Sequence, residues 1–286
     1  MRIGAAFHFV RFAGLGLAGF AFLSAPVAEA RPVPATEASE GLGSPFPSSV
    51  DGLSIGNAHL VATSGEGGRL YRGMRPRRPN EYAELKKLGV NRVVIFKNFV
   101  RGQERELGEE RRQLERLGLA PDAIVHLPMP WKDVRNYAET CGFVTAGLAE
   151  LEKSFRAKEG AAYFHCTVGE DRTGLLAGLV RQLSEGWDVE RAFREEMCRW
   201  GFAEGNPRKP PHVAQAVRKD LVPLYLKLSW AIERGQLRFD PKVEASPVES
   251  IHGAACAEDP EKSPEYRAFA RKWQRKLVCA TERPGP

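Results

Sequence analysis

The chain of 286 residues has only five cysteines and a formal net charge of only +6. Five cysteines are too few for a fold built on disulfides. Six excess positive charges do not make the basic surface of a nucleic-acid-binding protein. The sequence also lacks the long apolar runs of a multi-span membrane protein, an internal repeat and a cluster of metal-ligating residues. Its 43% hydrophobic and 27% charged residues are typical of a globular protein with one large or two small domains.

The first 30 residues have the pattern of a secretory signal peptide. Two arginines precede the apolar run of residues 12–23, and residues 28–30 (Ala-Glu-Ala) form a small-x-small cleavage pattern. The alternative is an uncleaved membrane anchor, which the short, glycine-rich run disfavours. We therefore expect cleavage after Ala30, a periplasmic or secreted protein without stable membrane association, and an oxidising compartment in which disulfides persist.

Three regions follow the signal peptide. Residues 31–50 are rich in Pro, Ser, Gly and Glu and predict a disordered linker. Residues 51–240 alternate strand and helix patterns, which predicts an α/β domain with a central, mostly parallel sheet flanked by helices. Residues 241–286 predict a C-terminal extension with a basic helix at 266–277. Within the domain, strands are expected at 69–72, 90–96, 123–127 and 161–165, and helices at 79–88, 104–117 (exposed on the flank of the sheet), 134–157, 173–183, 189–200 and 212–234.

Ten consecutive residues, His165 to Gly174 (HCTVGEDRTG), follow an expected buried strand and open an expected helix. Backbone N–H groups in such a loop can converge with the positive end of the helix dipole on one point, which suits a tetrahedral oxyanion. Gly169 supplies backbone freedom, and the guanidinium of Arg172 can hold two oxygens at once. The expected anion-binding residues are Thr167, Val168, Gly169, Glu170, Asp171 and Arg172.

Cys166 lies at the base of this loop and is the candidate nucleophile. Arg172, the helix end and the N–H groups are expected to lower the pKa of its thiol, so that the thiolate attacks a bound phosphorus atom. The hydroxyl of Thr173 is placed to hydrogen-bond to the sulfur. His165 points to the other face of the strand and is expected to bond to the loop backbone. The alternative is a buried structural cysteine, but no other cysteine has an arginine six residues later.

These ten residues resemble the signature loop of the protein tyrosine phosphatase superfamily, in the HCxxGxxRTG form of its dual-specificity branch. Residues 70–76 (LYRGMRP) resemble the YRSxxP strand of atypical bacterial and fungal members, with Gly73 in place of the usual Ser, and residues 93–98 (VVIFKN) resemble their next core strand. The resemblance spans about residues 60–235. It implies the fold of these phosphatases and hydrolysis of phosphate monoesters through a cysteinyl-phosphate, without a metal or other cofactor.

The resemblance also implies a general acid on a loop about thirty residues before the cysteine, because the leaving oxygen needs a proton. Asp133, which is 33 residues upstream and follows an expected strand, is our candidate. Its alternative role is the N-cap of the helix that is expected to begin near Val134. Asp122 is the alternative acid, but it precedes the strand.

The charges around the loop leave several interpretations open. Asp171 is expected to position a water molecule or hold an arginine, or else to be a solvated charge. Glu170 stands where several phosphoinositide-directed relatives carry Lys, which argues against a highly anionic lipid headgroup. Basic residues nearby either form a rim that steers anions or are scattered solubility charges. They are Arg72, Arg75, Arg77, Arg78, Lys97, Lys132 and Arg135, of which Arg72, Lys97 and Lys132 are, with His165, our candidate supporting residues.

The other four cysteines are less informative. Cys256 and Cys279 both lie in the extension and either pair with each other or stay free. Cys141 and Cys198 lie on expected helices and are either small apolar core residues or, for one of them, a reversible partner of Cys166.

The predicted function is that of a monomeric, secreted or periplasmic cysteine-dependent phosphatase. We expect it to act on phosphotyrosine or dual-specificity protein substrates, or on small phosphorylated molecules. The alternatives are an inositol-polyphosphate (phytase-like) or phosphoinositide phosphatase and a catalytically silent module that binds phosphorylated partners. The signal peptide and the modest charge disfavour an RNA 5′-triphosphatase.

Overall fold

A five-stranded sheet forms the centre of the fold in the computed structural model, which describes residues 53–98, 104–134, 136–239 and 255–279. The strand order is β1-β2-β5-β3-β4. Only β1 is antiparallel, to β2, and the other neighbours are parallel. The strands are β1 (His59–Thr63), β2 (Arg69–Gly73), β3 (Arg92–Phe96), β4 (Ile124–Leu127) and β5 (Ala161–His165).

The register of the parallel strands brings distant parts of the chain to one edge of the sheet. Gly73 pairs with His165, and His165 pairs with Ile95. The carboxyl ends of β2, β5, β3 and β4 therefore lie together. β5 is the last strand in the sequence but lies between β2 and β3 in the sheet, so the order of the strands reverses there. Ligands of open α/β sheets bind beyond the carboxyl ends of the strands at such a point.

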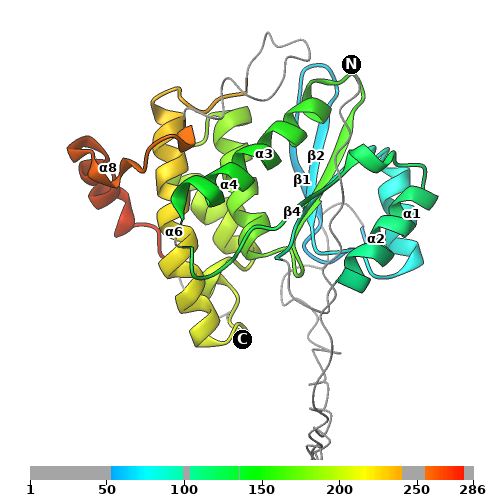
Figure 1. Ribbon diagram of the computed structural model, residues 1–286, viewed down its shortest axis with the longest axis horizontal. Helices are drawn as coiled ribbons and strands as arrows, with labels where there is room; N and C mark the ends of the chain where they lie inside the picture. The colour runs from blue at the N-terminus through cyan, green and yellow to red at the C-terminus, as the bar shows by residue number, and fades with distance from the viewer. Residues whose placement is uncertain (1–52, 99–103, 135, 240–254, 280–286) are drawn as a thin grey trace, which may run out of the picture. The chain divides into compact units, whose positions relative to one another are not determined.

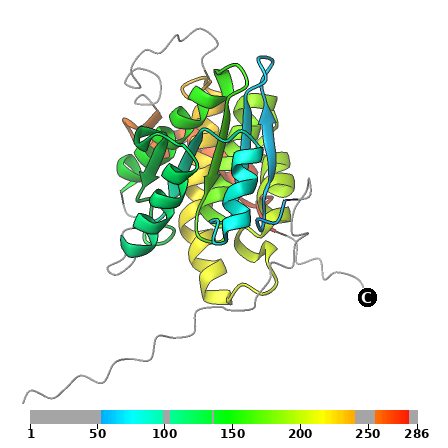
Figure 2. The ribbon, with the colours of Figure 1, turned by 90° about the vertical axis from the view of Figure 1, so that its right-hand side faces the viewer.

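Helices cover both faces of the sheet (Figure 1). On one face lie α1 (Pro79–Lys87) and α2 (Glu104–Arg116), which are nearest the viewer in Figure 2. On the other face lie α3 (Tyr137–Arg156), α4 (Asp171–Glu185) and α6 (Pro211–Glu233). Each layer encloses its own apolar core. The smaller core, under α1 and α2, includes Leu85, Leu114 and Tyr163.

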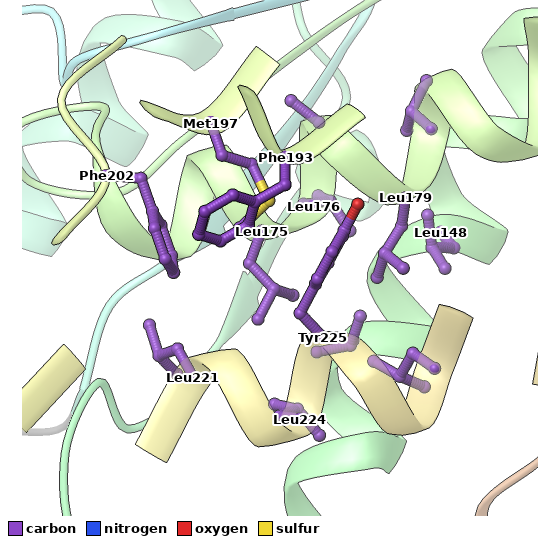
Figure 3. Close-up of a cluster of buried hydrophobic side chains, with 14 of the residues drawn as sticks. Leu148, Leu175, Leu176, Leu179, Phe193, Met197, Phe202, Leu221, Leu224 and Tyr225 are labelled. Carbon is purple, nitrogen blue, oxygen red and sulfur yellow. The ribbon is translucent and has the colours of Figure 1, made fainter. Parts of the chain in front are cut away.

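The larger core contains a π-helix that packs between α4 and α6 (Figure 3). The chain after α4 continues through α5 (Val189–Arg191), the π-helix Ala192–Met197 and two 3₁₀ turns, Cys198–Trp200 and Ala203–Gly205. Phe193 and Met197 of the π-helix point between Leu175 of α4 and Tyr225 of α6 in Figure 3. The side chains of these four residues are fully buried.

The C-terminal segment packs on α6 and is joined to the domain by two disulfides. It contains the 3₁₀ turn Pro260–Lys262 and α8 (Pro264–Gln274), whose Tyr266 and Phe269 lie against Trp230 of α6. Cys141 of α3 bonds to Cys256, and Cys198 bonds to Cys279. The prediction that Cys256 and Cys279 pair with each other is therefore wrong, and so is the placement of Cys141 and Cys198 as plain apolar core residues. Cys166 is free, which contradicts a bond to either of them.

The predicted α/β class and its expected strands are confirmed, with two differences. The antiparallel edge strand β1 has no clear signal in the sequence. The helix expected from Val134 begins at Tyr137, because Asn136 caps it by accepting a hydrogen bond from the backbone N–H of Glu139 (3.3 Å). The signal peptide, the linker and the expected boundary at residue 240 lie outside the described residues. Among the described helices, none combines the length and apolarity that a membrane span needs.

Candidate active site

The loop of residues 166–172, called the phosphate loop below, joins the carboxyl end of β5 to α4. β5 is the central strand of the sheet, so the loop lies between the ends of β2 and β3. The expected strand–loop–helix context of Cys166 is confirmed. The loop and the first turn of α4 therefore face the point at which the sheet order predicts a ligand.

Four consecutive carbonyl groups of the phosphate loop accept hydrogen bonds from surrounding residues. The carbonyl of Cys166 lies 2.9 Å from Nδ1 of His165, and that of Val168 lies 3.1 Å from Nδ2 of Asn57. The carbonyl of Gly169 lies 2.5 Å from Nη2 of Arg72. The carbonyl of Thr167, the fourth of these groups, lies 3.4 Å from the backbone nitrogen of Arg75, just beyond β2.

Holding these carbonyls fixes the direction of the N–H groups that follow them. In a trans peptide unit the C=O of one residue and the N–H of the next point to opposite sides. The N–H groups of residues 167–170 are therefore turned away from the surrounding protein. None of them donates a hydrogen bond to another described residue. Four unpaired donors on one short loop at a helix N-terminus form a site for a tetrahedral anion.

Two glycines allow this close packing. Gly169 has φ +72°, and a Cβ there would lie 2.5–2.6 Å from the backbone of Gly73 and Met74. A Cβ on Gly73 would lie 2.1 Å from the hydroxyl of Tyr163, which donates to the carbonyl of Met74 (2.5 Å). The hydroxyl of Tyr163 thus fills the space that the side chain of the usual Ser would need, which explains the departure at Gly73.

Cys166 is almost completely buried (3% exposed) at the base of the loop. Burial opposes ionisation of its thiol, but the charge of Arg172 and the hydrogen bonds of Thr173 outweigh burial and lower the pKa of Cys166 below its ordinary value. The buried hydroxyl of Thr173 has no other hydrogen-bond partner among the described residues. The structure therefore brings Cys166, Arg172 and Thr173 together, as the sequence predicts, and favours a thiolate.

Arg172 is oriented by residues that follow the neighbouring strands. Its Nη1 donates to Oδ1 of Asn98 (2.6 Å), beyond β3, and to the carbonyl of Met129 (3.1 Å), beyond β4. Its Nε and Nη2 make no hydrogen bond within the described part of the chain. Two donors of a planar guanidinium thus remain available for two oxygens of a phosphate group.

His165 contacts the loop backbone, as predicted, and also a residue that the prediction missed. Its Nε2 lies 2.8 Å from Oε1 of Glu110, on α2, and both side chains are at most 2% exposed. Burial alone would lower the pKa of His165, but the carboxylate of Glu110 and the carbonyl of Cys166 outweigh it and raise that pKa. The helix at 104–117, which we expected to be exposed, thus contributes a buried charge behind the nucleophile.

Arg72 holds the other end of the loop from inside the protein. Besides its bond to Gly169, its Nη1 donates to the carbonyl (2.7 Å) and to Oε1 (2.9 Å) of Glu196, in the π-helix. His59 and Arg181 also contact this carboxylate, at 2.9 and 3.0 Å. Burial opposes its charge, but the hydrogen bond of His59 and the positive charges around it lower the pKa of Glu196 to about 2. The arginine is completely buried, so it is not part of a basic rim.

Glu170 and Asp171 form ion pairs with a lysine rather than facing solvent. Nζ of Lys209 lies 3.1 Å from Oε2 of Glu170 and also contacts Asp171. Asp171 further accepts a hydrogen bond from the backbone N–H of Ala203 (3.0 Å). The expectation that Asp171 holds an arginine or is a solvated charge is therefore wrong. Burial raises the pKa of Glu170, although Lys209 opposes this.

The other basic candidates are largely paired. Lys97 is buried and bonds to Glu106 (2.6 Å), which also binds Arg75. Lys132 is exposed, with its ammonium 5.3 Å from the ring centre of Trp131. Arg135 lies outside the described residues. A rim built from all seven basic residues is therefore wrong, and Lys97 supports the site only through its internal ion pair.

Asp133, the candidate acid, lies on the exposed loop between β4 and α3. Its φ of 56° is unusual for a non-glycine residue, and its N–H donates to Oδ2 of Asp220 on α6 (2.7 Å). The alternative role as a helix cap is wrong, because Asn136 caps α3. The same loop is joined to Arg172 through Met129. Asp122, the alternative acid, lies before β4, at the opposite end of that strand from the phosphate loop.

The sequence did not reveal five residues that support the site. They are Asn57, Asn98, Glu110, Glu196 and Lys209. Each acts across a long separation in sequence, such as 124 residues between Arg72 and Glu196. Only Asn98 carries a signal, since it ends the VVIFKN strand next to the site.

Comparison with known proteins agrees with the geometry of this loop. A sequence model of the tyrosine phosphatase family matches residues 66–188. The dual specificity protein phosphatase TpbA of Pseudomonas aeruginosa (strain UCBPP-PA14) is 35% identical over 135 residues, or 47% of this chain and 52% of that protein. The chain is therefore similar to the tyrosine phosphatase family over residues 66–188. It spans about half the length of this curated relative.

Two solved structures are also similar. The crystal structure of P. aeruginosa TpbA has 28% sequence identity and a TM-score of 0.41, over 67% of this chain and 99% of that chain. The core catalytic domain of the PP-IP phosphatase SIW14 from S. cerevisiae has 21% identity and a TM-score of 0.38, over 57% of this chain and 85% of that chain.

Proposed function

We propose that the chain hydrolyses phosphate monoesters of proteins, phosphotyrosine among them, through a cysteinyl-phosphate on Cys166. One observation supports this most directly. A buried cysteine whose thiol pKa is lowered lies in a loop with four unpaired N–H groups and two available donors of Arg172. A pure binding module has no need of an ionised sulfur at this position.

In the first step, the thiolate of Cys166 attacks the phosphorus atom, and the bond from phosphorus to the leaving oxygen breaks. The loop N–H groups and Arg172 hold the three equatorial oxygens throughout, because their positions are fixed before the substrate binds. Asp133 donates its proton to the leaving oxygen, so that a neutral alcohol or phenol departs.

In the second step, water attacks the cysteinyl-phosphate, and Asp133, now a carboxylate, takes the proton of that water. The sulfur departs as a thiolate and inorganic phosphate is released. The hydroxyl of Thr173 has no other partner among the described residues and stabilises the departing thiolate. Both steps balance without an additional cofactor.

The charges around the loop favour substrates with a single phosphate group over inositol polyphosphates. Most nearby cations are already paired: Arg72 with Glu196, Lys97 with Glu106 and Lys209 with Glu170 and Asp171. Arg172 is therefore the main cation that the loop offers to a ligand, whereas several clustered phosphates need several free cations. The name of TpbA, a dual specificity protein phosphatase, points the same way.

A phosphate-release panel with phosphotyrosine and phosphoserine peptides, a phosphoinositide and an inositol polyphosphate tests this proposal. Phosphotyrosine peptides are expected to give the highest kcat/KM. Cys166→Ser should abolish turnover and keep substrate binding, because a serine hydroxyl is not ionised there. Residual turnover above about 5% would reject the covalent mechanism. A higher kcat/KM for the inositol polyphosphate would reject the substrate class.

Asp133→Asn tests the acid. It should lower kcat by about 10²–10⁴-fold on substrates with a poor leaving group and much less on an activated aryl phosphate, which hardly needs the proton. The matched control is Asp122→Asn, at the far end of β4, which should leave kcat unchanged. An equal loss on both kinds of substrate would reject the acid role of Asp133.

The proposed location is the periplasm or the exterior of the cell. Two disulfides join described parts of the chain, and disulfides persist mainly in oxidising compartments. The N-terminal signal pattern supports the same location. Sequencing the N-terminus of the protein recovered from a periplasmic fraction should give Arg31 as the first residue. A protein found in the cytoplasm with its first 30 residues intact would contradict the proposal.

A further inference from the structure

Helix α2 carries one buried acid among exposed ones. Of its five glutamates only Glu110 is buried, with 2% exposure, although the sequence around it is highly charged. A buried carboxylate is costly unless a positive charge compensates it. The cation that compensates Glu110 is His165, the residue before the nucleophile.

The three groups form a chain from the helix to the loop. Oε1 of Glu110 lies 2.8 Å from Nε2 of His165, and Nδ1 of the same ring lies 2.9 Å from the carbonyl of Cys166. The 2.8 Å contact is an ion-pair distance without hydrogen-bond alignment, so Glu110 acts on the ring through its charge. Together with the carbonyl that faces Nδ1, this charge favours the ring form in which both nitrogens carry a hydrogen, the imidazolium.

Among the described residues, His165 is the one cation in contact with Glu110. The ionisable groups that act on Glu110 and His165 from the neighbouring elements are Tyr82, His126, Tyr163 and Cys166 itself. Burial lowers the pKa of His126, which keeps that ring neutral. From α4, Arg172 and Asp171 act on the sulfur with opposite signs. The charge state of His165 therefore depends on Glu110.

We propose that Glu110 is a positioning residue of the active site, which holds His165 as an imidazolium against the carbonyl of Cys166 and thereby keeps the sulfur ionised and the first loop peptide in place. This inference rests on the proposed function of Cys166 as the nucleophile. The resemblance to known phosphatases supplied no role for this glutamate, which comes from a helix outside the signature loop.

The direct test is the pH dependence of Cys166 alkylation by iodoacetamide in the Glu110→Gln protein, followed by mass spectrometry. Gln has nearly the same size as Glu, so the exchange removes the charge and keeps the packing of the side chain. The thiol of the variant should ionise at higher pH, and alkylation at about pH 6 should slow by about three- to tenfold. The matched control is Glu109→Gln, on the exposed side of the same helix, which should leave the profile unchanged.

A double-mutant cycle tests whether Glu110 acts through His165. His165→Asn alone should shift the alkylation profile, and adding Glu110→Gln to it should cause no further shift. Glu110→Asp, which keeps the charge, should restore most of the wild-type profile. Equal shifts from Glu110→Gln in both backgrounds would overturn the proposed route.

The wild-type protein provides a test that does not depend on folding of a variant. In an NMR titration of labelled histidines, the ring of His165 should lose its proton above the ordinary histidine value of 6.5. A ring that loses its proton at or below that value, or an alkylation profile of Glu110→Gln that overlays wild type, would overturn the inference. Because alkylation requires no turnover, such a failure would leave the phosphatase proposal standing, whereas turnover by Cys166→Ser would reject that proposal itself.

Discussion

The two ends of the phosphate loop are held in the same way by different chemistry. At each end a buried carboxylate contacts a cation, and that cation donates to a loop carbonyl. At the Cys166 end the carboxylate is Glu110 and the cation is His165, and at the Gly169 end they are Glu196 and Arg72. An arginine stays charged at any relevant pH, whereas a histidine loses its proton near neutrality. One end is thus a permanent support, and the other is titratable.

The two ends also differ in the number of partners that each carboxylate has and in the layer of the fold from which it comes. Glu196 lies in a π-helix, binds two arginines as well as His59, and belongs to the layer that contains the larger core. Glu110 has one cationic partner among the described residues and comes from α2, on the opposite face of the sheet (Figure 1). π-helical turns are rare and often occur near functional sites, and this one places a carboxylate behind Arg72. We therefore expect the arginine end to determine stability and the histidine end to determine reactivity.

The largest effect on stability is expected from Arg72→Met. The exchange keeps much of the buried volume but leaves the carbonyl of Gly169 and one side of Glu196 without a partner. Breaking a buried ion pair in this way costs about 3–5 kcal/mol of unfolding free energy, measured by chemical denaturation. The control is Arg112→Met, whose ion pair with Glu109 is exposed on both sides and should cost less than about 1 kcal/mol. Similar losses in both variants would show that the arginine end is not a special support.

The disulfides provide the next test, because only one of them is joined to the arginine end. Cys198 directly follows the π-helix, whereas Cys141 lies on α3. Replacing either pair by alanines should cost about 2–5 kcal/mol. Only loss of Cys198–Cys279 should also raise KM, because the segment after Cys198 supplies Ala203 and Lys209, which bind Asp171. An equal rise of KM in both double variants would contradict this difference.

The pH dependence of stability separates the two ends directly. The raised pKa of His165 means that its stabilising contribution is complete below the ordinary value of 6.5 and is lost as the pH rises through the folded-state value. The destabilisation by Glu110→Gln should therefore be larger at about pH 6 than at about pH 9. The pKa of Glu196 is lowered from 4.5 to about 2, so its contribution persists above 4.5 and is lost only as the pH falls towards 2.

The destabilisation by Glu196→Gln should accordingly be constant between about pH 9 and pH 7, above the range in which His59 changes its charge. Denaturation curves of both variants and wild type across this range provide the measurement. A parallel pH dependence in the two variants would remove the distinction between a permanent and a titratable support.

The smallest effect is expected from Lys209→Met. Lys209 neutralises Glu170 and Asp171, so its loss leaves two carboxylates unpaired next to the anion site. KM for a phosphotyrosine peptide should rise by about three- to tenfold, with little change in kcat, because repulsion weakens binding of ground state and transition state alike. A change in kcat alone would show that Lys209 instead acts on the reaction itself.

The local parts of this structure were predictable from the sequence. The strands β2 to β5 carry β-branched and apolar residues, and the loop from Cys166 to Arg172 follows one of them directly. Such signals depend only on residues that are neighbours in the sequence, so they can be recognised without the tertiary structure. The helix at 104–117 was also found, but its burial was misjudged because a single inward-facing Glu110 does not change a charged pattern.

The supports of the loop and the disulfides were not predictable for a physical reason. Asn57 reaches Val168 across 111 residues, and Cys141 bonds to Cys256 across 115. These contacts depend on strand order and on the packing of the C-terminal segment, which no local pattern encodes. The prediction that Cys256 pairs with Cys279 was wrong for the same reason, because it assumed that cysteines close in the sequence are also close in space.

The most direct test of the central claim is the trapping of phosphate on Cys166. The protein should be mixed rapidly with an activated aryl phosphate and quenched in acid, and its peptides examined by mass spectrometry. We expect one phosphoryl group on the peptide that contains Cys166, formed and lost at rates that account for turnover, and none in Cys166→Ser. Turnover in wild type with no phosphoryl group on Cys166 at any quench time would contradict the account.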